Sequence, residues 1–302
     1  MDVWVPEQTA PELRAMLPDG ISVHDLPQHG ELPAALGHAD MLIAGFFHER
    51  PAEAIPRLAG LRVVQSLSAG VDLLVSRIPS GVTLCDRSGI HDASVSEWVV
   101  MATLAMRRRL PEHVLQQQRA AWRFGGGSDL EGANVLIVGH GSIGRALEAR
   151  LAPLGARVTR VARTKRDSVH GVDELSALLP DADVVVLLVP LTPDTRGMVD
   201  AAFLQRMRDG ALLVNAARGA IVDTDALLTA LREERIRAAL DVTDPEPLPD
   251  GHPLWTAPGV LITPHIGGAV SRVFERGWRF AGEQVRRYLA GEPLRNVVVD
   301  GY

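Results

Sequence analysis

The stretch Asn134-Val-Leu-Ile-Val-Gly139-His140-Gly141-Ser142-Ile143-Gly144 decides the fold of this chain. Its apolar run predicts a buried strand, its glycines predict a tight turn, and residues 145–151 continue as a helix. In such a segment the first glycine permits the turn, the second admits a pyrophosphate, and the third lets helix pack on strand. The alternative is a glycine-rich turn without a ligand. We expect a dinucleotide site whose phosphate-binding residues are Gly139, Gly141, Ser142, Ile143 and Gly144, at a helix N-terminus that favours anions.

The turn after the next predicted strand, 156–162, bears on the choice of cofactor. An NAD-binding domain usually places Asp or Glu there, about twenty residues beyond the fingerprint, for the ribose 2′-hydroxyl. This chain instead reads Arg163-Thr164-Lys165-Arg166. A guanidinium matches a 2′-phosphate, which a carboxylate would repel. The sequence therefore predicts NADP(H) as the preferred cofactor, with NAD(H) possible; Arg163 and Thr164 are the leading contacts and Lys165 or Arg166 assist. The alternative is a solvated basic turn with no ligand.

Composition and charge narrow the class of protein. The chain has 302 residues, of which 46% are hydrophobic and 23% charged, as in ordinary globular proteins with room for two domains. A net charge of −6 argues against nucleic acid or an anionic membrane as a partner. The sequence shows no apolar run of the roughly eighteen residues that span a bilayer, and its N-terminus does not read as a signal peptide. We expect a cytoplasmic protein in which the single Cys85 is a core residue.

Strand and helix patterns alternate along the chain, which favours an α/β fold with parallel sheets. A long helix is predicted from 94 to about 122, and Pro111 should kink or divide it. The tail at 297–299 could return to the first domain, so the chain should cross between domains near 89–91 and near 267–268. The predicted strands are 3–5, 21–23, 40–44, 61–65 and 82–84, then 134–138, 156–162, 183–189, 211–215, 236–242 and 260–263.

Polar and charged residues follow several strands of the second series. The segments 215–219, 239–242, 244–247 and 263–268 lie at or just beyond predicted strand ends, where parallel sheets bind ligands. They supply an arginine, carboxylates and a histidine, a set suited to reducing a 2-keto acid. Arginine can hold the substrate carboxylate through two parallel hydrogen bonds, and histidine can exchange the alcohol proton near neutral pH. A carboxylate beside the histidine fixes its ring.

These segments make the chain similar to one enzyme family. It resembles the D-isomer-specific 2-hydroxyacid dehydrogenases, which include glyoxylate/hydroxypyruvate reductases, phosphoglycerate dehydrogenases and D-lactate dehydrogenases. The resemblance implies two similar doubly wound parallel-sheet domains, usually paired as homodimers. Residues 1–90 plus 271–302 would be the substrate-binding domain, and residues 91–270 a Rossmann dinucleotide-binding domain inserted in it. The segments that carry the resemblance are 68–72, 95–97, 139–144, 189–197, 215–219, 241–247, 252–255 and 263–268.

The resemblance also implies residue roles. Arg218 would orient the substrate, Glu246 would be the partner of the histidine, and His265 would donate the proton. Asp241 would hydrogen-bond the nicotinamide carboxamide. No metal ion is expected. The remaining implied contacts are Pro190, Thr195 and Ala216 for the cofactor, and Ser68, Ala69, Gly70 and Val71, with Arg218 and His265, for the substrate.

The resemblance thus implies an NADPH-dependent reductase of a small 2-keto acid such as glyoxylate or hydroxypyruvate, because the basic turn is similar to that of the NADPH-preferring members. One alternative is an NAD-linked dehydrogenase of another 2-hydroxy acid, such as D-3-phosphoglycerate. Another is a non-catalytic, corepressor-like protein that senses dinucleotides. Two residues depart from the family pattern: Trp98 should affect packing only, and His140 should lie near the phosphates, solvated. Phe46 and Phe47 could line the substrate pocket or belong to the core.

Overall fold

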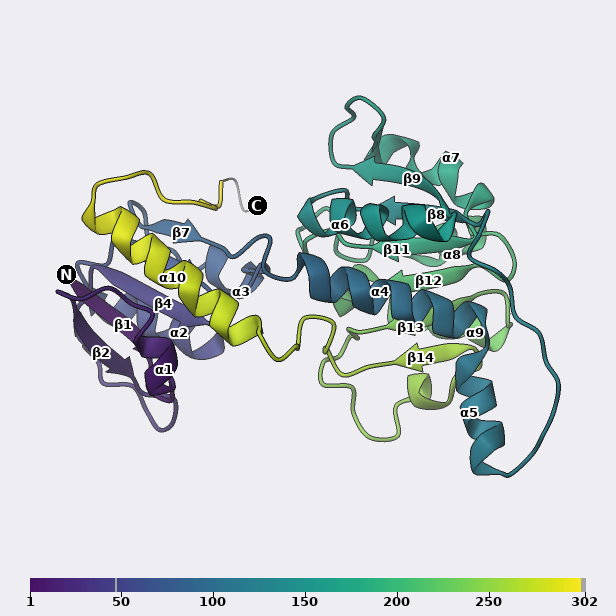
Figure 1. Ribbon diagram of the computed structural model, residues 1–302, viewed down its shortest axis with the longest axis horizontal. Helices are drawn as coiled ribbons and strands as arrows, with labels where there is room; N and C mark the ends of the chain where they lie inside the picture. Colours follow the sequence, from purple (N-terminus) through teal and green to yellow (C-terminus); the bar gives the residue numbers. More distant parts are fainter. Residues whose placement is uncertain (47, 300–302) are drawn as a thin grey trace. The chain divides into compact units, whose positions relative to one another are not determined.

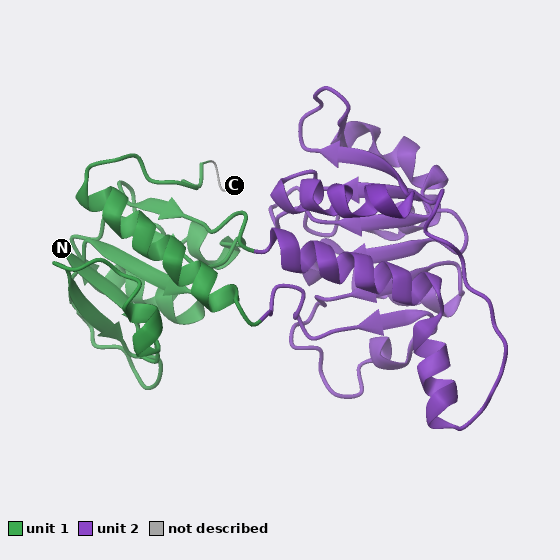
Figure 2. Ribbon diagram, in the orientation of Figure 1, with its two compact units in different colours: residues 1–90, 271–302 green, residues 91–270 purple. Residues whose placement is uncertain are grey.

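The computed structural model describes residues 1–46 and 48–299. The chain divides into two compact units, unit 1 with residues 1–90 and 271–302 and unit 2 with residues 91–270 (Figure 2). Each unit has a parallel sheet with helices on both faces. The α/β fold class with parallel sheets is therefore confirmed.

Unit 1 is built on a sheet of five parallel strands in the order β2-β1-β4-β6-β7. Alternate side chains of the strands pack toward opposite faces, so Val3 and Val5 of β1 lie in one cluster and Trp4 in the other. Helices α1 and α10 cover the first face, and α2 and α3 cover the second. The elements are β1 (Asp2–Pro6), α1 (Pro11–Arg14), β2 (Ser22–Leu26), β3 (Gly37–His38), β4 (Met41–Gly45), α2 (Glu49–Ala54), η1 (Ile55–Arg57), β5 (Leu58–Ala59), β6 (Val63–Ser66), α3 (Asp72–Val75), β7 (Thr83–Cys85) and α10 (Val273–Leu289).

The C-terminal tail lies beside β7. Val297 pairs with Cys85 in an antiparallel bridge, and the Val298 N–H donates to the Leu84 carbonyl at 2.9 Å. The predicted return of the tail to the first domain is therefore confirmed.

Unit 2 has a sheet of seven parallel strands in the order β10-β9-β8-β11-β12-β13-β14. The strand order reverses between β8 and β11, and ligands of doubly wound sheets bind at such a reversal, beyond the carboxyl ends of the strands. The strands are β8 (Asn134–Val138), β9 (Arg157–Ala162), β10 (His170–Gly171), β11 (Val184–Leu187), β12 (Leu212–Asn215), β13 (Arg237–Leu240) and β14 (Val260–Ile262).

Helices cover both faces of the second sheet (Figure 1). Val135 and Ile137 of β8 pack toward α4 and α6, whereas Leu136 and Val138 pack toward the opposite face, where α7, α8 and α9 lie. Burial on both faces explains why the central strands contain apolar runs, at 135–138 in β8, 184–187 in β11 and 212–214 in β12. The helices are α4 (Asp92–Arg107), α5 (Leu110–Gln118), α6 (Ser142–Leu151), η2 (Ala152–Leu154), η3 (Val172–Glu174), α7 (Leu175–Leu178), η4 (Leu179–Asp181), α8 (Ala201–Arg206), η5 (Gly219–Ile221), α9 (Thr224–Arg232) and η6 (Pro253–Thr256).

The long helix predicted from 94 to about 122 is divided in two. The break falls at Arg109, whose φ of 56° is left-handed, and Pro111 lies in the first turn of α5, where its missing N–H does no harm. The helix also ends earlier than predicted, at Gln118. Within the described ranges, no helix combines the length and apolar character needed to cross a membrane.

Candidate active site

The fingerprint loop connects β8 to α6 and uses its glycines in three ways. Gly139 has a φ of 108°, and a Cβ atom built on it would lie 2.6 Å from the Leu188 carbonyl carbon. A Cβ atom on Gly144 would lie 2.5 Å from the Gly139 oxygen, so only glycine allows α6 to approach the turn. A Cβ atom on Gly141 would meet nothing within 4 Å. Gly141 is the N-cap residue of α6 and has no side chain to cap the helix, so N–H groups of the helix N-terminus lie beside open space. This arrangement fits a phosphate group.

The basic turn after β9 divides into two pairs of residues. Lys165 Nζ lies 2.9 Å from Glu174 Oε1, and Arg166 Nη2 donates to the His140 carbonyl at 2.9 Å. Arg163 and Thr164 are exposed, and their side chains make no hydrogen bond or ion pair with another residue of the described ranges. The two leading candidates for a 2′-phosphate are thus open to solvent, while the two assisting ones are held by the protein.

Glu174 fixes the outer side of this turn. Its carboxylate contacts His170 Nδ1 at 2.9 Å as well as Lys165, and these hydrogen bonds, that of His170 first, lower the pKa of Glu174 from 4.5 to about 2. The carboxylate is therefore ionised at every pH at which the protein would bind a nucleotide. Glu174 thus balances the charge of Lys165, and Arg166 is held by a carbonyl oxygen, whereas the Arg163 side chain makes no hydrogen bond or ion pair among the described residues.

The other expected cofactor residues follow neighbouring strands. Thr195 Oγ1 donates to the Pro190 carbonyl at 2.6 Å and accepts from the Thr192 N–H at 2.8 Å, so one hydroxyl closes the loop after β11. Ala216 is half-buried directly after β12. Both segments lie at the carboxyl edge of the sheet, which also carries the fingerprint loop.

His265 and Glu246 are brought together, as the resemblance implied. His265 Nδ1 lies 2.6 Å from Glu246 Oε1, and both side chains are partly exposed, at 48% and 39%. With a proton on Nδ1, the ring donates to the carboxylate and its Nε2 is the atom available to a ligand. The pair therefore has the arrangement of an oriented acid–base group.

Asp241 holds the loop that carries His265. Its carboxylate is 4% exposed and accepts from the Thr263 hydroxyl at 2.5 Å and from the N–H groups of Ile266 and Gly267 at 2.9 and 2.7 Å. The His265 N–H donates to the Asp241 carbonyl at 2.7 Å, and His265 has a left-handed φ of 54°. A carboxylate can accept about four hydrogen bonds, so one acceptor position remains for the predicted carboxamide contact. Its role in shaping the loop was not predicted.

Arg218 follows β12, the strand next to β13. Asn215 shapes its turn by donating to the Arg218 carbonyl at 2.9 Å and accepting from the Ala217 N–H at 3.1 Å. A Cβ atom on Gly219 would lie 1.9 Å from the Thr243 oxygen, so glycine lets this turn pack against the chain that leads to Glu246. The half-buried Arg218 is thereby placed at the same sheet edge as Asp241 and His265.

In unit 1, the loop at 68–71 is fixed by a buried hydroxyl. Ser66 Oγ donates to the Ser68 carbonyl at 3.1 Å and accepts from the Ser68 N–H at 2.9 Å. The buried His48 contacts the same oxygen through Nε2 at 2.8 Å. Ser68, Ala69 and Gly70 are partly exposed, whereas Val71 is buried in the core. Neither Ser66 nor His48 was predicted to act on this loop, because their contact joins positions eighteen residues apart.

The structure confirms one of the other predictions about single side chains and contradicts another. Trp98 is buried in the core of unit 2, consistent with the predicted role in packing. The expectation that His140 is solvated is wrong: its ring is 8% exposed, because Nε2 is held at 2.8 Å by Glu148 from α6. Phe46 packs edge-on against Phe274 at 4.9 Å between centroids, and Phe47 lies outside the described residues.

One group of described residues has the donor atoms of a metal site. Ligand atoms of Asp2, His38 and Asp40 lie within 4.8 Å of one another. The two carboxylates also have partners in the protein: Asp2 Oδ1 contacts His24 Nε2 at 2.7 Å, and Asp40 Oδ2 accepts from the Asp2 N–H at 2.8 Å.

The chain is similar to a family model and to proteins of known sequence and structure. A family model, "D-isomer specific 2-hydroxyacid dehydrogenase, NAD binding domain", matches residues 100–267. Glyoxylate reductase/hydroxypyruvate reductase of Mus musculus is 34% identical over 250 residues, which are 78% of this chain and 76% of that protein. The NADPH-dependent glyoxylate/hydroxypyruvate reductase of Sinorhizobium meliloti, solved with NADP and sulfate, aligns with a TM-score of 0.87 at 30% identity and covers 100% of this chain and 99% of that one.

A longer relative also matches. D-3-phosphoglycerate dehydrogenase of Mycobacterium leprae is 31% identical over 312 residues, which cover 99% of this chain. The match covers only 59% of that enzyme, so the chain spans little more than half the length of this curated relative.

Proposed function

Because the chain belongs to the D-isomer-specific 2-hydroxyacid dehydrogenase family, we propose that it reduces a small 2-keto acid to the D-2-hydroxy acid with NADPH. The observation that carries the proposal is the 2.6 Å contact between His265 and Glu246 at the sheet edge that also bears the fingerprint loop. A protein that only sensed dinucleotides would need the fingerprint but not this pair. The presence of this pair therefore favours an enzyme over a corepressor-like protein.

The cofactor site is proposed from the residues that fit it. Gly139, Gly141 and Gly144 would receive the pyrophosphate at the α6 N-terminus, together with the N–H groups of Ser142 and Ile143. Asp241, Pro190, Thr195 and Ala216 are the proposed contacts toward the nicotinamide half. When bound, the dihydronicotinamide supplies the hydride for the keto carbon.

The preference for NADPH rests on the basic turn. Arg163 has no partner among the described residues, and Thr164 beside it offers a hydroxyl. A 2′-phosphate matches this pair, whereas the ribose hydroxyl of NADH would find no carboxylate in the turn. NADP in the Sinorhizobium meliloti structure agrees with this proposal, which Arg163 would carry in this chain.

The chemical step is assigned to His265. Its Nδ1–H donates to Glu246, so the ring is held in one orientation and Nε2 can give a proton to the alkoxide oxygen as the alcohol forms. Arg218 would bind the substrate carboxylate by two parallel charge-assisted hydrogen bonds and polarise the neighbouring carbonyl. In unit 1, N–H groups at 68–71 are proposed as further ligands of that carboxylate.

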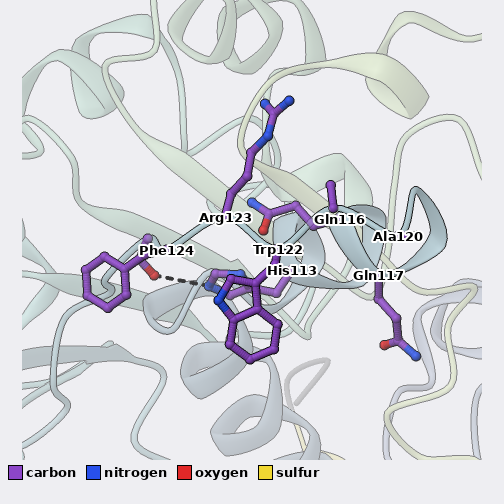
Figure 3. A pocket seen from close by; sticks show the side chains of 9 residues that line it. His113, Gln116, Gln117, Ala120, Trp122, Arg123 and Phe124 are labelled. Carbon is purple, nitrogen blue, oxygen red and sulfur yellow. Dashed lines mark hydrogen bonds between the residues drawn. The ribbon is translucent and has the colours of Figure 1, made fainter.

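We also propose that the protein forms a homodimer through α5 and the segment that follows it. Trp122 and Phe124 are fully exposed, and Leu110 and Leu115 of α5 are half exposed. Trp122, Arg123 and Phe124 line a hollow of about 530 Å³. Figure 3 shows how their side chains project from this segment. Apolar side chains gathered in this way mark association surfaces, and the family's usual dimer makes a second copy the proposed occupant.

The experiment that tests the function is a spectrophotometric assay of the full chain with NADPH and NADH against glyoxylate, hydroxypyruvate, pyruvate and phosphohydroxypyruvate. We expect faster turnover with NADPH and with the two small polar keto acids. Turnover of phosphohydroxypyruvate with NADH alone would favour the phosphoglycerate dehydrogenase alternative. Nucleotide binding without turnover of any 2-keto acid in a broad panel would favour the sensing alternative.

A further inference from the structure

We infer that His140, Glu148 and Arg160 are positioning residues for NADPH selectivity, because they fix the basic turn at 163–166 against the fingerprint loop. This inference rests on the proposed cofactor site and adds to it residues that would not touch the cofactor. The three side chains come from the fingerprint loop, helix α6 and strand β9, whose labels can be followed in Figure 1.

Glu148 is the centre of the arrangement. Its Oε2 receives the His140 Nε2–H at 2.8 Å, and its Oε1 receives Arg160 Nε at 2.8 Å together with a second, closer contact from Arg160 Nη2. These partners, Arg160 first, lower the pKa of Glu148 below its ordinary value of 4.5. The carboxylate therefore stays charged at neutral pH and holds an imidazole on one side and a guanidinium on the other.

The arrangement extends to the basic turn at Arg166 and to the residues just after the turn at Ser168. Arg160 Nη1 donates to the Ser168 carbonyl at 3.2 Å, and Arg166 Nη2 donates to the His140 carbonyl at 2.9 Å. Arg166 and Val169 also exchange backbone hydrogen bonds at 3.1 and 2.9 Å, which close the turn on itself. The basic turn is thus joined to the fingerprint loop by the Arg166 side chain, and the residues just after the turn are joined to it through Arg160, Glu148 and His140.

Simple packing does not account for a histidine at position 140. Its Nδ1 is buried and has no hydrogen-bond partner among the described residues, and leaving a buried polar atom unsatisfied is destabilising. An apolar side chain would fill the same space without that cost. What the histidine provides is the Nε2–H for Glu148, which otherwise would hold only Arg160.

The position of the turn should determine how well Arg163 and Thr164 can contact the 2′-phosphate. Arg163 and Thr164 are exposed and lack partners of their own among the described residues, so only their backbone fixes where they can meet a ligand. A charge-assisted contact depends on placement to within a fraction of an ångström. Loosening the turn should therefore weaken the binding of NADPH much more than the binding of NADH, because NADH has no phosphate at this position.

The test is the dissociation constant of each nucleotide, measured by calorimetry on the full chain. Arg160→Met removes the contacts to Glu148 and Ser168, and we expect Kd for NADPH to rise roughly tenfold while Kd for NADH changes less than about twofold. Glu148→Gln keeps the shape of the side chain and should give a smaller change in the same direction; Arg160→Lys, which retains the charge, should partly restore NADPH binding. Arg208→Met is the matched control, because Arg208 pairs with Asp183 before β11, at the opposite edge of the sheet, and it should alter neither constant.

An equal rise in both constants, or no rise in either, in folded Arg160→Met and Glu148→Gln proteins would overturn the inference. The melting temperature of each variant shows whether it is folded. If the wild-type chain bound neither nucleotide, the proposed cofactor site itself would fail, and the inference with it. If it bound NADPH but reduced no keto acid, only the proposed reaction would fail, and the binding constants would still decide the inference.

Discussion

Glu246 Oε1 lies 2.6 Å from His265 Nδ1, although the two residues belong to separate loops, one after β13 and the other after β14. Each loop is held by its own contacts: Thr243 Oγ1 donates to the Pro245 carbonyl at 2.9 Å, and Asp241 binds the loop that carries His265. The pair is therefore preformed without a ligand. An enzyme gains from such preorganisation because little rearrangement is needed when charge develops.

The role of Asp241 leads to a prediction about loop geometry. Asp241→Asn places an amide N–H against the N–H of Ile266 or Gly267, or leaves one of them with a weaker acceptor. We expect the free energy of unfolding to fall by roughly 1.5–3 kcal/mol, the range for hydrogen bonds to a charged group, and kcat to fall with it. Urea unfolding and steady-state assays measure the two effects. Asp183→Asn is the control. Asp183 precedes β11 and accepts from the N–H of Asn134, the first residue of β8, at the opposite edge of the sheet from the site. This variant should lower the free energy of unfolding but leave kcat of the folded protein unchanged.

The glycines of the fingerprint give a matched pair of variants. A methyl group at Gly141 meets open space, so Gly141→Ala should melt like the wild type yet bind NADPH at least about tenfold more weakly, because the backbone can no longer approach the pyrophosphate. Gly144→Ala forces a Cβ atom against the Gly139 oxygen and should lower the melting temperature as well. Differential scanning fluorimetry and nucleotide titration separate the effects. Unchanged NADPH affinity in Gly141→Ala would show that no phosphate binds there.

Cofactor preference should depend on the charge at position 163. Arg163→Asp replaces the exposed guanidinium by a carboxylate, which repels a 2′-phosphate and can accept from a ribose hydroxyl. The ratio of kcat/KM for NADPH to that for NADH should fall by about 10² or more, since a favourable contact becomes a repulsive one. Steady-state kinetics with both nucleotides measure the ratio, and an unaltered ratio would remove Arg163 from the site.

Cys85 supplies a prediction about pH. Burial, and then the neighbouring Asp86, raise the pKa of the Cys85 thiol from 9.0 to about 12. The thiolate is the reactive form, so the native protein should resist iodoacetamide at pH 8, whereas the urea-unfolded chain should react fully. Because the unfolded thiol ionises at lower pH, the contribution of Cys85 to stability is complete below about pH 9 and is lost as the pH rises toward 12. Mass spectrometry after timed alkylation checks this, and rapid labelling of the native chain at pH 8 would contradict it.

Much of the fold was predictable because its signals are local. The strand, turn and helix at 134–151 depend on neighbouring residues, and the apolar runs of β11 and β12 reflect burial on both faces. Helix α8, of six residues, was not predicted. The division of the long helix near Pro111 was predicted and is confirmed, but the position of the break at Arg109 depends on one backbone conformation that an arginine rarely adopts.

The site was predicted less completely, because its supporting contacts join distant positions. The pairing of Glu246 with His265 came from family resemblance and is seen in the structure. The Asp241 carboxylate accepts from the N–H groups of Ile266 and Gly267, which lie 25 and 26 positions further along the chain. Burial of His140 depends on Glu148, two turns along α6, and nothing in the loop sequence alone indicates that the side chain turns toward it.

The most direct test of the central claim compares wild type, His265→Gln and Glu246→Gln for turnover and for NADPH binding. If His265 donates the proton and Glu246 orients it, both variants should bind NADPH with nearly unchanged Kd, while kcat with glyoxylate or hydroxypyruvate falls by about 10²–10⁴ in His265→Gln and by a smaller factor in Glu246→Gln. Wild-type turnover by a folded His265→Gln protein would contradict the account.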